Sequence, residues 1–565
     1  MRIHSLTLAV ILIGCSPIPD APTSPTSPDT PPTLSATSIH GMVVTGSPAA
    51  TAAGVAILES GGNAIDAAVA TALALAVAEP TQSGLGGRTQ ALVHLADGTS
   101  FGFDGTTAVP ADYDPDTAEQ AEDGYAVIGV PGTVAALDAV LRQGGSMAWA
   151  DVIAPAIALA EDGVALTGGE ADRLASIADR LRQSDGARTA FLRQNGAPYA
   201  AGDTLRQPDL AGVLRTLRDE GPDAFYRGRI ADAIARDLED HGYVRRADLE
   251  TYRPLPSLLT HGRLGSLDLL GTYLPASGGT TIEALQIIAQ VGVDTLSPDE
   301  RAVATALSLL AAFEDREAAW NDPRPAEEDA AWITSITRAE ERATEIRASL
   351  APPPGTLALV PAPAARRATF PVRTTSLESS FTTHLSVVDD LGNAVSMTQS
   401  LGPNGGSRVA TPGLGFLYAA TLGGYLGRVE PGDRPWSSQS PLIGLRAGRP
   451  VFVIGGAGSR RIISGLVGTL LRVEVDGASL SDAIAAPRLH PSSTWTFEKV
   501  NGQGSSGTRP AGAVLAESLG HDVVERPFDV WFARLNAIAI DRSTGAFEGV
   551  ADPRWPWGSA AGPER

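Results

Sequence analysis

The sequence predicts a mixed α/β fold in which helices surround a core of strands drawn largely from the last third of the chain. Helical patterns dominate residues 47–80, 130–255 and 300–348, whereas the chain beyond residue 381 is rich in short apolar segments typical of strands. Apolar residues make up 43% of the 565 residues and charged residues 19%, which is enough to bury a core and unlike the composition of disordered chains.

The N-terminal residues resemble a bacterial lipoprotein signal. Met1-Arg2 is a short basic start, residues 5–14 (SLTLAVILIG) form an apolar run, and Cys15 follows directly. The run is shorter than the ~20 residues that a membrane-spanning helix needs. We expect residues 1–15 to be a lipoprotein signal peptide, with a lipid anchor at Cys15 on the periplasmic or extracellular face of a bacterial envelope. The alternative is an ordinary signal peptide with an incidental cysteine.

A proline-rich segment comes next. Residues 16–35 contain seven prolines, a composition that favours extended polyproline II and cannot bury a core. We expect residues 16–38 to be a semi-rigid tether, with the folded unit beginning near Ile39.

Two helices and a hairpin are predicted in the first part of the folded unit. Ser47 is a good cap for a helix with Pro48 in its first turn, Gly61-Gly62 ends that helix, and Asn63 can cap a second helix over residues 64–78. Residues 90–104 then predict a hairpin that turns at Asp97-Gly98.

Further elements follow from the same patterns. Residues 149–161 and 207–219 are amphipathic helices, and residues 351–367 are a Pro/Ala-rich loop. Beyond residue 381 the patterns predict a strand pair at 384–388 and 394–399, buried strands at 451–454 and 537–540, and helices at 462–471 and 481–486.

Charge and motifs exclude several functions. The 43 Lys and Arg residues against 64 Asp and Glu give a formal charge of −21, which repels phosphate backbones and argues against nucleic-acid binding. The eight histidines form no metal-binding motif, so we expect no metal and no cofactor. Residues 456–461 (GAGSRR) lack the third glycine of a dinucleotide site, but backbone amides at that helix start could hold an oxyanion or a carboxylate.

Thr382 offers the most specific chemistry. If the chain breaks between Phe381 and Thr382, Thr382 carries a free α-amine beside its own hydroxyl. A nucleophile and its general base then lie on one residue, a recognised way to activate a weak hydroxyl. Taken alone, Thr382-Thr383-His384 is more typical of the start of a strand than of a nucleophile.

The surrounding residues resemble the γ-glutamyltranspeptidase family of N-terminal-nucleophile hydrolases. The segment TTHLSVVDDLGNAVSMTQS (382–400) resembles the start of the family's small subunit. Other blocks agree in the same order: GGNAIDAA (61–68), GLGG (84–87), VPGT (130–133), PAI (155–157) with LAE (159–161), QPDL (207–210), GPDAFY (221–226), SGG (277–279), RP (434–435) with SS (437–438), PR (487–488) and ADPR (551–554).

This resemblance implies a four-layer αββα sandwich and self-cleavage before Thr382. It implies a large chain over residues 39–381 and a small chain over 382–565 that stay together as a heterodimer. Thr382 forms an acyl-enzyme with a small-molecule amide or peptide, in the family glutathione and other γ-glutamyl compounds, and water or an amine resolves it. The alternatives are an acylase with another acyl group and a non-catalytic relative that binds ligands.

The resemblance also assigns site residues. The catalytic set is Thr382, its supporting hydroxyl Ser400, and the oxyanion pair Gly458 and Ser459. The substrate-binding set is Ser437, Ser438, Thr106 and Thr421.

Three departures concern glutamate recognition. Thr106 stands where the family has a carboxylate-binding arginine, Gly402 replaces an asparagine, and residues 419–424 lack the acid that meets the substrate amine. Charged hydrogen bonds of this kind are each worth about 1.5–3 kcal/mol. One hypothesis is that Arg88 or Arg408 compensates for the missing arginine.

Overall fold

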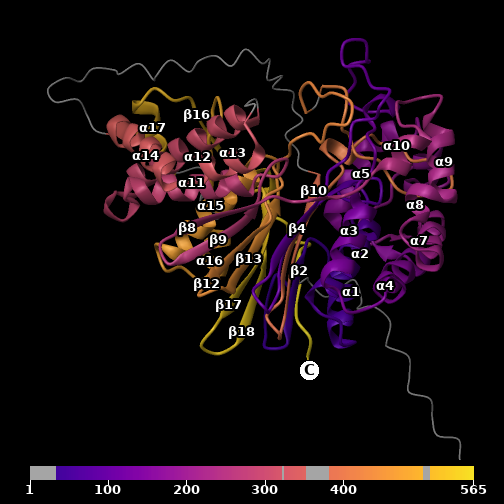
Figure 1. Cartoon of the computed structure of the whole chain (residues 1–565), viewed down its shortest axis with the longest axis horizontal. Helices are drawn as coiled ribbons and strands as arrows, with labels where there is room; N and C mark the ends of the chain where they lie inside the picture. Colours follow the sequence, from indigo (N-terminus) through magenta and orange to yellow (C-terminus); the bar gives the residue numbers. More distant parts are fainter. Residues whose placement is uncertain (1–32, 321–323, 351–380, 425, 500–508, 565) are drawn as a thin grey trace, which may run out of the picture. The chain divides into compact units, whose positions relative to one another are not determined.

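The computed structural model describes residues 33–320, 324–350, 381–424, 426–499 and 509–564. Two seven-stranded sheets form its centre (Figure 1). Sheet I has the order β1 (Ser35–Ser38), β18 (Ala546–Ala551), β17 (Arg534–Asp541), β13 (Arg449–Ala457), β12 (Leu442–Arg446), β9 (Leu267–Thr272) and β8 (Leu259–Leu264). Sheet II has the order β19 (Ser559–Ala561), β2 (Gly41–Thr45), β10 (Thr382–Asp389), β11 (Ala394–Ser400), β3 (Arg88–His94), β4 (Ser100–Gly105) and β7 (Leu255–Pro256).

The two sheets pack face to face through an apolar layer that includes Met42, Leu92, Leu270, Val453 and Ile538. Helices cover the outer face of each sheet, and Figure 1 shows the four layers side by side. The predicted αββα sandwich is therefore confirmed.

The helices beside sheet II include α2 (Ala64–Ala78), whose 15 residues are all buried. Asn63 caps it as predicted, because its side chain accepts hydrogen bonds from the amides of Ile65 and Asp66. The other helices of this half are α1 (Pro48–Glu59), α3 (Thr133–Gly144), α4 (Trp149–Asp162), α5 (Gly168–Leu181), α6 (Asp185–Phe191), α7 (Pro208–Glu220), α8 (Ala224–Arg227), α9 (Arg229–Leu238) and α10 (Arg246–Thr251).

The helices beside sheet I include α11 (Gly278–Val291) and α15 (Arg461–Glu474), which share an apolar cluster with Leu269, Ile454 and Leu535 of the sheet. The remaining helices here are α12 (Pro298–Trp320), α13 (Ala326–Ile333), α14 (Ile336–Leu350), α16 (Leu480–Ala485) and α17 (Ala513–Ser518). A small sheet of β14 (Leu489–His490), β15 (Trp495–Glu498) and β16 (Val523–Arg526) lies outside the sandwich, as does the pair β5 (Val164–Ala165) and β6 (Thr204–Leu205).

Three expectations need correction. Seven of the fourteen sandwich strands precede Phe381, so the strand core is not drawn largely from the last third. The predicted hairpin at 90–104 is present as β3 and β4. Other strands of this part are interrupted by glycine, as in β8 (LTHGRL) and β9 (LDLLGT), which hid them among helices. The fold also begins before Ile39, because β1 pairs with β18. Ser47 makes no side-chain cap, since Thr45 rather than Ser47 supplies the hydroxyl bonded there.

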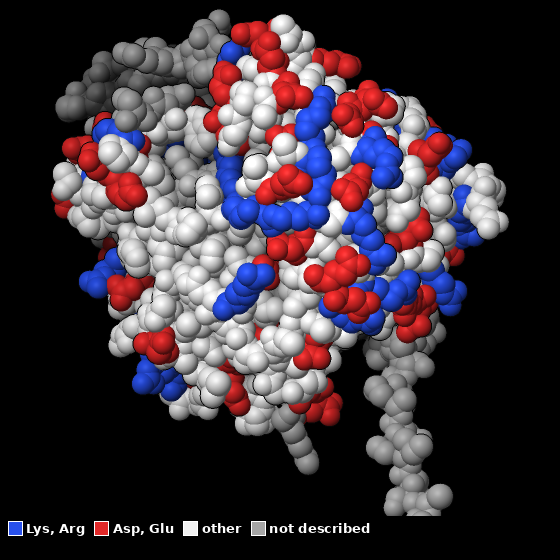
Figure 2. Space-filling view, turned by 45° about the vertical axis from the view of Figure 1, so that its right-hand side comes forward, with Lys and Arg blue, Asp and Glu red and all other residues white. Residues whose placement is uncertain are grey.

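Several predicted features lie outside the described residues, namely residues 1–15 with Cys15, most of the tether, and the loop at 351–367. Within the part that is described, no helix is both long and apolar enough to cross a membrane. On the face shown in Figure 2, arginines lie beside acidic residues, consistent with surface ion pairs such as Arg246–Asp232 at 2.8 Å.

Candidate active site

Thr382 and Ser400 meet at one end of the central hairpin of sheet II. Thr382 begins β10, Ser400 ends β11, and the antiparallel register places them directly opposite each other. Their hydroxyl oxygens are 2.9 Å apart. The Ser400 hydroxyl also donates to the carbonyl oxygen of Phe381 at 3.1 Å and accepts from the amide of Gly402 at 3.0 Å.

These contacts fix the direction of the hydrogen bonds. A serine hydroxyl has one proton, and in this arrangement Ser400 gives it to the carbonyl of Phe381. The hydrogen bond between the two hydroxyls is then donated by Thr382. The hydroxyl proton of Thr382 thus points toward Ser400, which at the same time polarises the carbonyl of Phe381.

A buried polar network holds the carbonyl of Thr382, and sequence reasoning missed it. Arg534 of β17 reaches across from sheet I and donates to the Thr382 carbonyl oxygen at 2.5 Å. The same guanidinium contacts the side chain of Gln82 and lies 3.4 Å from Glu79. Gln82 in turn donates to Glu79 at 3.0 Å and to Glu170 at 2.9 Å. The guanidinium of Arg534 is therefore held between the carbonyl of Thr382 and the side chains of Gln82 and Glu79.

Phe381, the residue before Thr382, is buried at 4% exposure. The guanidinium of Arg173 lies 4.4 Å from the centre of its ring, and also 4.9 Å from that of Trp555. Arg534 lies 4.3 Å from the ring of Trp555. The two cations and two aromatic rings pack the residues on either side of the Phe381–Thr382 peptide bond.

Gly458 and Ser459 form the turn between β13 and α15, at the same end of the sandwich. Ala457, the last residue of β13, pairs with Arg534, and the guanidinium of Arg534 bonds to Thr382. The turn that follows Ala457 is therefore close in the fold to Thr382. Gly458 has φ +155° and Ser459 φ 56°. A Cβ on Gly458 would lie 2.3 Å from Cβ of Ala533, so only glycine fits there. Among the described residues, no backbone carbonyl accepts from either amide.

Ser437 and Ser438 lie in the segment before β12. Ser437 is buried, and its amide donates to the carbonyl of Pro275 at 2.7 Å. Its hydroxyl exchanges hydrogen bonds with Gln439, whose side chain donates to the carbonyl of Thr398 at 2.7 Å. Thr398 belongs to β11, two residues before Ser400, which ties the serine pair to the strand that carries the supporting hydroxyl.

Thr106 and Thr421 are both fully buried and already hydrogen-bonded. The hydroxyl of Thr106 accepts from Gln90 at 2.9 Å. Thr421 donates to Thr107 at 2.8 Å, so the two predicted substrate-binding threonines lie in one neighbourhood. Neither threonine carries a charge that could bind a substrate carboxylate or ammonium, and the hydroxyl of Thr421 is already bonded to Thr107.

His384 lies two residues from Thr382 on the same face of β10. Its ring nitrogens pair with Thr398 at 2.8 Å and with Ser386 at 3.2 Å. Burial lowers its pKa to about 3, because a charged imidazolium cannot be hydrated there. His384 is therefore neutral at physiological pH and is bonded on both sides within the sandwich.

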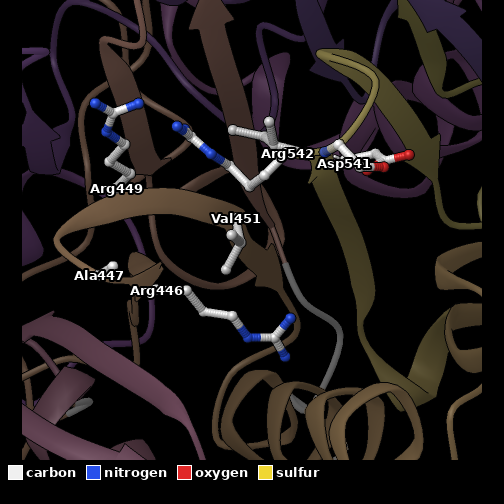
Figure 3. Close-up of a pocket in the computed structure, with 8 residues that line it drawn as sticks. Arg446, Ala447, Arg449, Val451, Asp541 and Arg542 are labelled. Carbon is white, nitrogen blue, oxygen red and sulfur yellow. Dashed lines mark hydrogen bonds between the residues drawn. The ribbon is translucent and has the colours of Figure 1, made fainter.

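One surface hollow lies away from the residues around Thr382. A surface hollow of about 800 Å³ is lined by Arg446, Arg449 and Arg542 and lies at the turns β12–β13 and β17–β18 (Figure 3). It is at the start of β13, whereas Gly458 follows the end of that strand. Within the described residues no group of three potential metal ligands is present.

Comparisons with known proteins identify the family of this chain. Residues 50–562 match the sequence profile described as gamma-glutamyltranspeptidase. A glutathione hydrolase proenzyme of Pseudomonas sp. (strain A14) is 31% identical over 82% of this chain and 83% of that protein. An acylase ACY 1 proenzyme of Pseudomonas sp. (strain V22) is 30% identical over 91% of this chain and 92% of its own length.

Among solved structures, cephalosporin acylase from Bacillus halodurans superposes with a TM-score of 0.77 at 25% sequence identity. The match covers 97% of this chain and all of the acylase chain. The chain thus shares its fold with an acylase over nearly its whole length, and its sequence with relatives named as hydrolases and as acylases. This chain belongs to the gamma-glutamyltranspeptidase family, within the N-terminal-nucleophile hydrolases.

Proposed function

We propose that this chain is a self-cleaving amide hydrolase and acyltransferase of the gamma-glutamyltranspeptidase type, with Thr382 as its nucleophile. The observation that carries the proposal is the chain of hydrogen bonds from Thr382 through Ser400 to the carbonyl of Phe381. The names of two relatives, both proenzymes, are consistent with a precursor that must be cut.

Self-cleavage follows from this hydrogen-bonded chain. Thr382 Oγ1 attacks the carbonyl carbon of Phe381 while its proton passes to Ser400, and Ser400 gives its own proton to the carbonyl oxygen. Collapse of this intermediate breaks the bond to the Thr382 nitrogen, which takes up a proton and becomes an amine. Water then hydrolyses the ester between Phe381 and Thr382 Oγ1, leaving a carboxylate on Phe381 and a free Thr382.

The two chains, one ending at Phe381 and the other beginning at Thr382, would remain a heterodimer. Strand β10 pairs with β2, and β11 pairs with β3, so sheet II is built from both sides of the cut. Apolar cores shared by the two parts, such as Val387 and Val395 with α2, oppose dissociation as well.

The acyl-transfer step uses the new α-amine as general base, since its reference pKa of about 7.7–8.0 suits proton transfer near neutral pH. Thr382 Oγ1 attacks the amide carbonyl of the donor, and the α-amine moves the hydroxyl proton to the departing amine. The amides of Gly458 and Ser459 stabilise the oxyanion. Water or an acceptor amine then attacks the ester and releases the acyl group.

The family's donors, glutathione and other γ-glutamyl amides, are the first candidates for the acyl donor. A second candidate is an acyl group without an α-ammonium, as the acylase relatives suggest. A specific observation favours it: residues 419–424 contain no acid, and a side chain at Gly423 would lie 2.2 Å from the carbonyl of Ala121. No carboxylate in that segment can form an ion pair with the ammonium of glutamate.

Two assays test the proposal. A denaturing gel of the purified protein should resolve two chains. A single intact chain in protein that is folded would contradict the proposal and favour a non-catalytic binding module. Release of nitroaniline from γ-glutamyl, glutaryl and pentanoyl p-nitroanilides then ranks the donors. Activity on γ-glutamyl above glutaryl favours the first candidate, and the reverse order favours the second.

We further propose that Cys15 carries a lipid anchor and that the proline-rich residues between Cys15 and β1 tether the enzyme to the envelope surface. The support is the apolar run before Cys15 and the proline content after it. Labelling of growing cells with a palmitate analogue should mark the wild-type protein and not Cys15→Ala. Equal labelling of the two, or none in either, would contradict the anchor.

A further inference from the structure

Phe381 provides the first acyl group that Thr382 carries. In the self-cleavage proposed above, the carbonyl carbon of Phe381 moves from the Thr382 nitrogen to Thr382 Oγ1 and forms an ester. In acyl transfer, the acyl carbon of a donor forms an ester with the same oxygen. The two esters differ only in the acyl group, so the surroundings of Phe381 bear directly on which acyl groups fit beside Thr382.

The ring of Phe381 lies in a buried space beside a cation. The residue is 4% exposed, and the guanidinium of Arg173 lies 4.4 Å from the centre of its ring. The same guanidinium lies 4.9 Å from the ring of Trp555. Burial and the neighbouring Arg534 lower the pKa of Arg173 to about 10, which leaves it charged at neutral pH. The ring of Phe381 therefore meets a positive charge, and we call the space that it fills the ring site.

The walls of the ring site are held by contacts that do not involve Phe381. The indole nitrogen of Trp555 donates to the carbonyl of Gly46 at 3.0 Å. The backbone of α5 packs directly on the indole, because a Cβ at Gly169 would lie 2.2 Å from it. Arg173 follows one turn later on the same helix. Both walls therefore stay in position when the ring of Phe381 leaves.

Acyl transfer requires that Phe381 leaves. Hydrolysis of the first ester gives Phe381 a carboxylate next to Thr382 Oγ1, at the point where the carbonyl of a donor must bind. A donor reaches Thr382 only after this carboxylate has moved away. The ring moves with it, since only Cα and Cβ separate the ring from the carboxylate. Departure of Phe381 thus uncovers the guanidinium of Arg173 beside the nucleophile.

We infer that the ring site binds an aromatic ring in the acyl group of the donor, and that Arg173 is the residue that determines this specificity. The inference rests on the proposed function and refines its second candidate, an acyl group without an α-ammonium. Two carbons separate the carbonyl of Phe381 from its ring, so the acyl group of equal reach is 3-phenylpropanoyl. The substrate class is the amides of arylalkanoic acids, because a guanidinium attracts the face of an aromatic ring and not that of a saturated ring.

The test compares two donors of equal length on the cleaved enzyme, 3-phenylpropanoyl and 3-cyclohexylpropanoyl p-nitroanilide. Wild type should prefer the phenyl donor in kcat/KM by about 2- to 30-fold, the equivalent of about 0.5–2 kcal/mol for a cation over an aromatic face. Arg173→Leu should abolish this preference, and Arg173→Lys should keep part of it. The control Arg193→Leu removes a similar contact with the ring of Tyr199, at 5.5 Å, and should keep the wild-type preference.

Binding provides a second readout that needs neither turnover nor an Arg173 variant. The acid 3-phenylpropanoate should raise the Tm of cleaved wild type more than 3-cyclohexylpropanoate does. It should not raise the Tm of uncleaved Thr382→Ala, in which Phe381 still fills the ring site.

Equal kcat/KM for the two donors in wild type would overturn the inference, as would a full preference in Arg173→Leu or an equal rise in Tm for cleaved wild type and Thr382→Ala. Turnover of γ-glutamyl p-nitroanilide without any preference for the phenyl donor would remove the ring site and leave the proposed function standing. Cleaved protein that releases nitroaniline from no donor, yet shows the ring-dependent rise in Tm, would refute the proposed function and leave the ring site standing.

Discussion

Ser400→Ala removes one oxygen atom and with it three contacts at the candidate scissile bond. Ser400 Oγ lies 2.9 Å from Thr382 Oγ1, 3.1 Å from the carbonyl oxygen of Phe381 and 3.0 Å from the amide of Gly402. The first two contacts act on the self-cleavage reaction, whereas the third acts on the folded structure. In this one variant, the rate of self-cleavage reports the loss of the first two contacts, and the free energy of unfolding reports the loss of the third.

The magnitude follows from the role of the Phe381 carbonyl. Its oxygen gains negative charge as Thr382 attacks and before Ser400 protonates it, and removal of one donor to such an oxygen costs about 2.7–4 kcal/mol, or roughly 10²- to 10³-fold in rate. The amide of Gly402 loses its acceptor in a buried place, which lowers the free energy of unfolding by about 1–3 kcal/mol. Ser400→Thr keeps the hydroxyl, and its branched side chain suits a strand, so it should cleave close to the wild-type rate.

The assay is a time course of freshly purified precursor on a denaturing gel, with circular dichroism to show that each variant is folded. Slow cleavage in Ser400→Ala and near-normal cleavage in Ser400→Thr are expected. Cleavage of folded Ser400→Ala within threefold of wild type would refute the proposed proton path.

Three further predictions concern the surroundings of Thr382. Arg534→Met removes the 2.5 Å hydrogen bond to the Thr382 carbonyl and should slow self-cleavage by about 10- to 150-fold, and Arg534→Lys should recover part of the rate. Equal cleavage rates of Arg534→Met and wild type on a denaturing gel would contradict this. Gly458→Ala places a Cβ 2.3 Å from that of Ala533 and should lower kcat of the cleaved enzyme more than KM, which steady-state kinetics measures; an unchanged kcat would exclude this turn from the site. His384, with its pKa lowered to about 3, takes up a proton in the unfolded chain below pH ~6.5 but not in the fold, so stability falls as pH drops between these values. The loss is at most about 1.4 kcal/mol per pH unit, and urea unfolding of His384→Gln at pH 7, 5.5 and 4.5 should show a shallower slope than wild type; identical slopes would count against it.

The sequence predicted those elements whose signals are local. Asn63 after Gly61-Gly62 marks the start of α2, and the turn near Gly392 sets the hairpin that brings Thr382 opposite Ser400. The hairpin of β8 and β9 was missed, although its turn contains Gly265 at φ 58°, a signal of the kind that two-residue hairpins give.

Contacts between distant segments could not be predicted in the same way. Strand β13 extends beyond the apolar residues 451–454 through Gly455. Glycine is needed there because the ring of His384 occupies the space of a side chain, and a Cβ would lie 2.2 Å from that ring. Arg534 likewise stands in an ordinary strand pattern, and only the packing of sheet I on sheet II brings its guanidinium to Thr382. Such pairings depend on the arrangement of whole sheets and leave no local pattern.

The most direct test of the account is the N-terminal sequence and intact mass of the chains in purified protein, for wild type and for Thr382→Ala. The account predicts that wild type yields two chains, the smaller beginning at Thr382 and the larger ending at Phe381, and that Thr382→Ala remains one folded chain. A folded wild-type protein that stays intact, or is cut at any other bond, would contradict it.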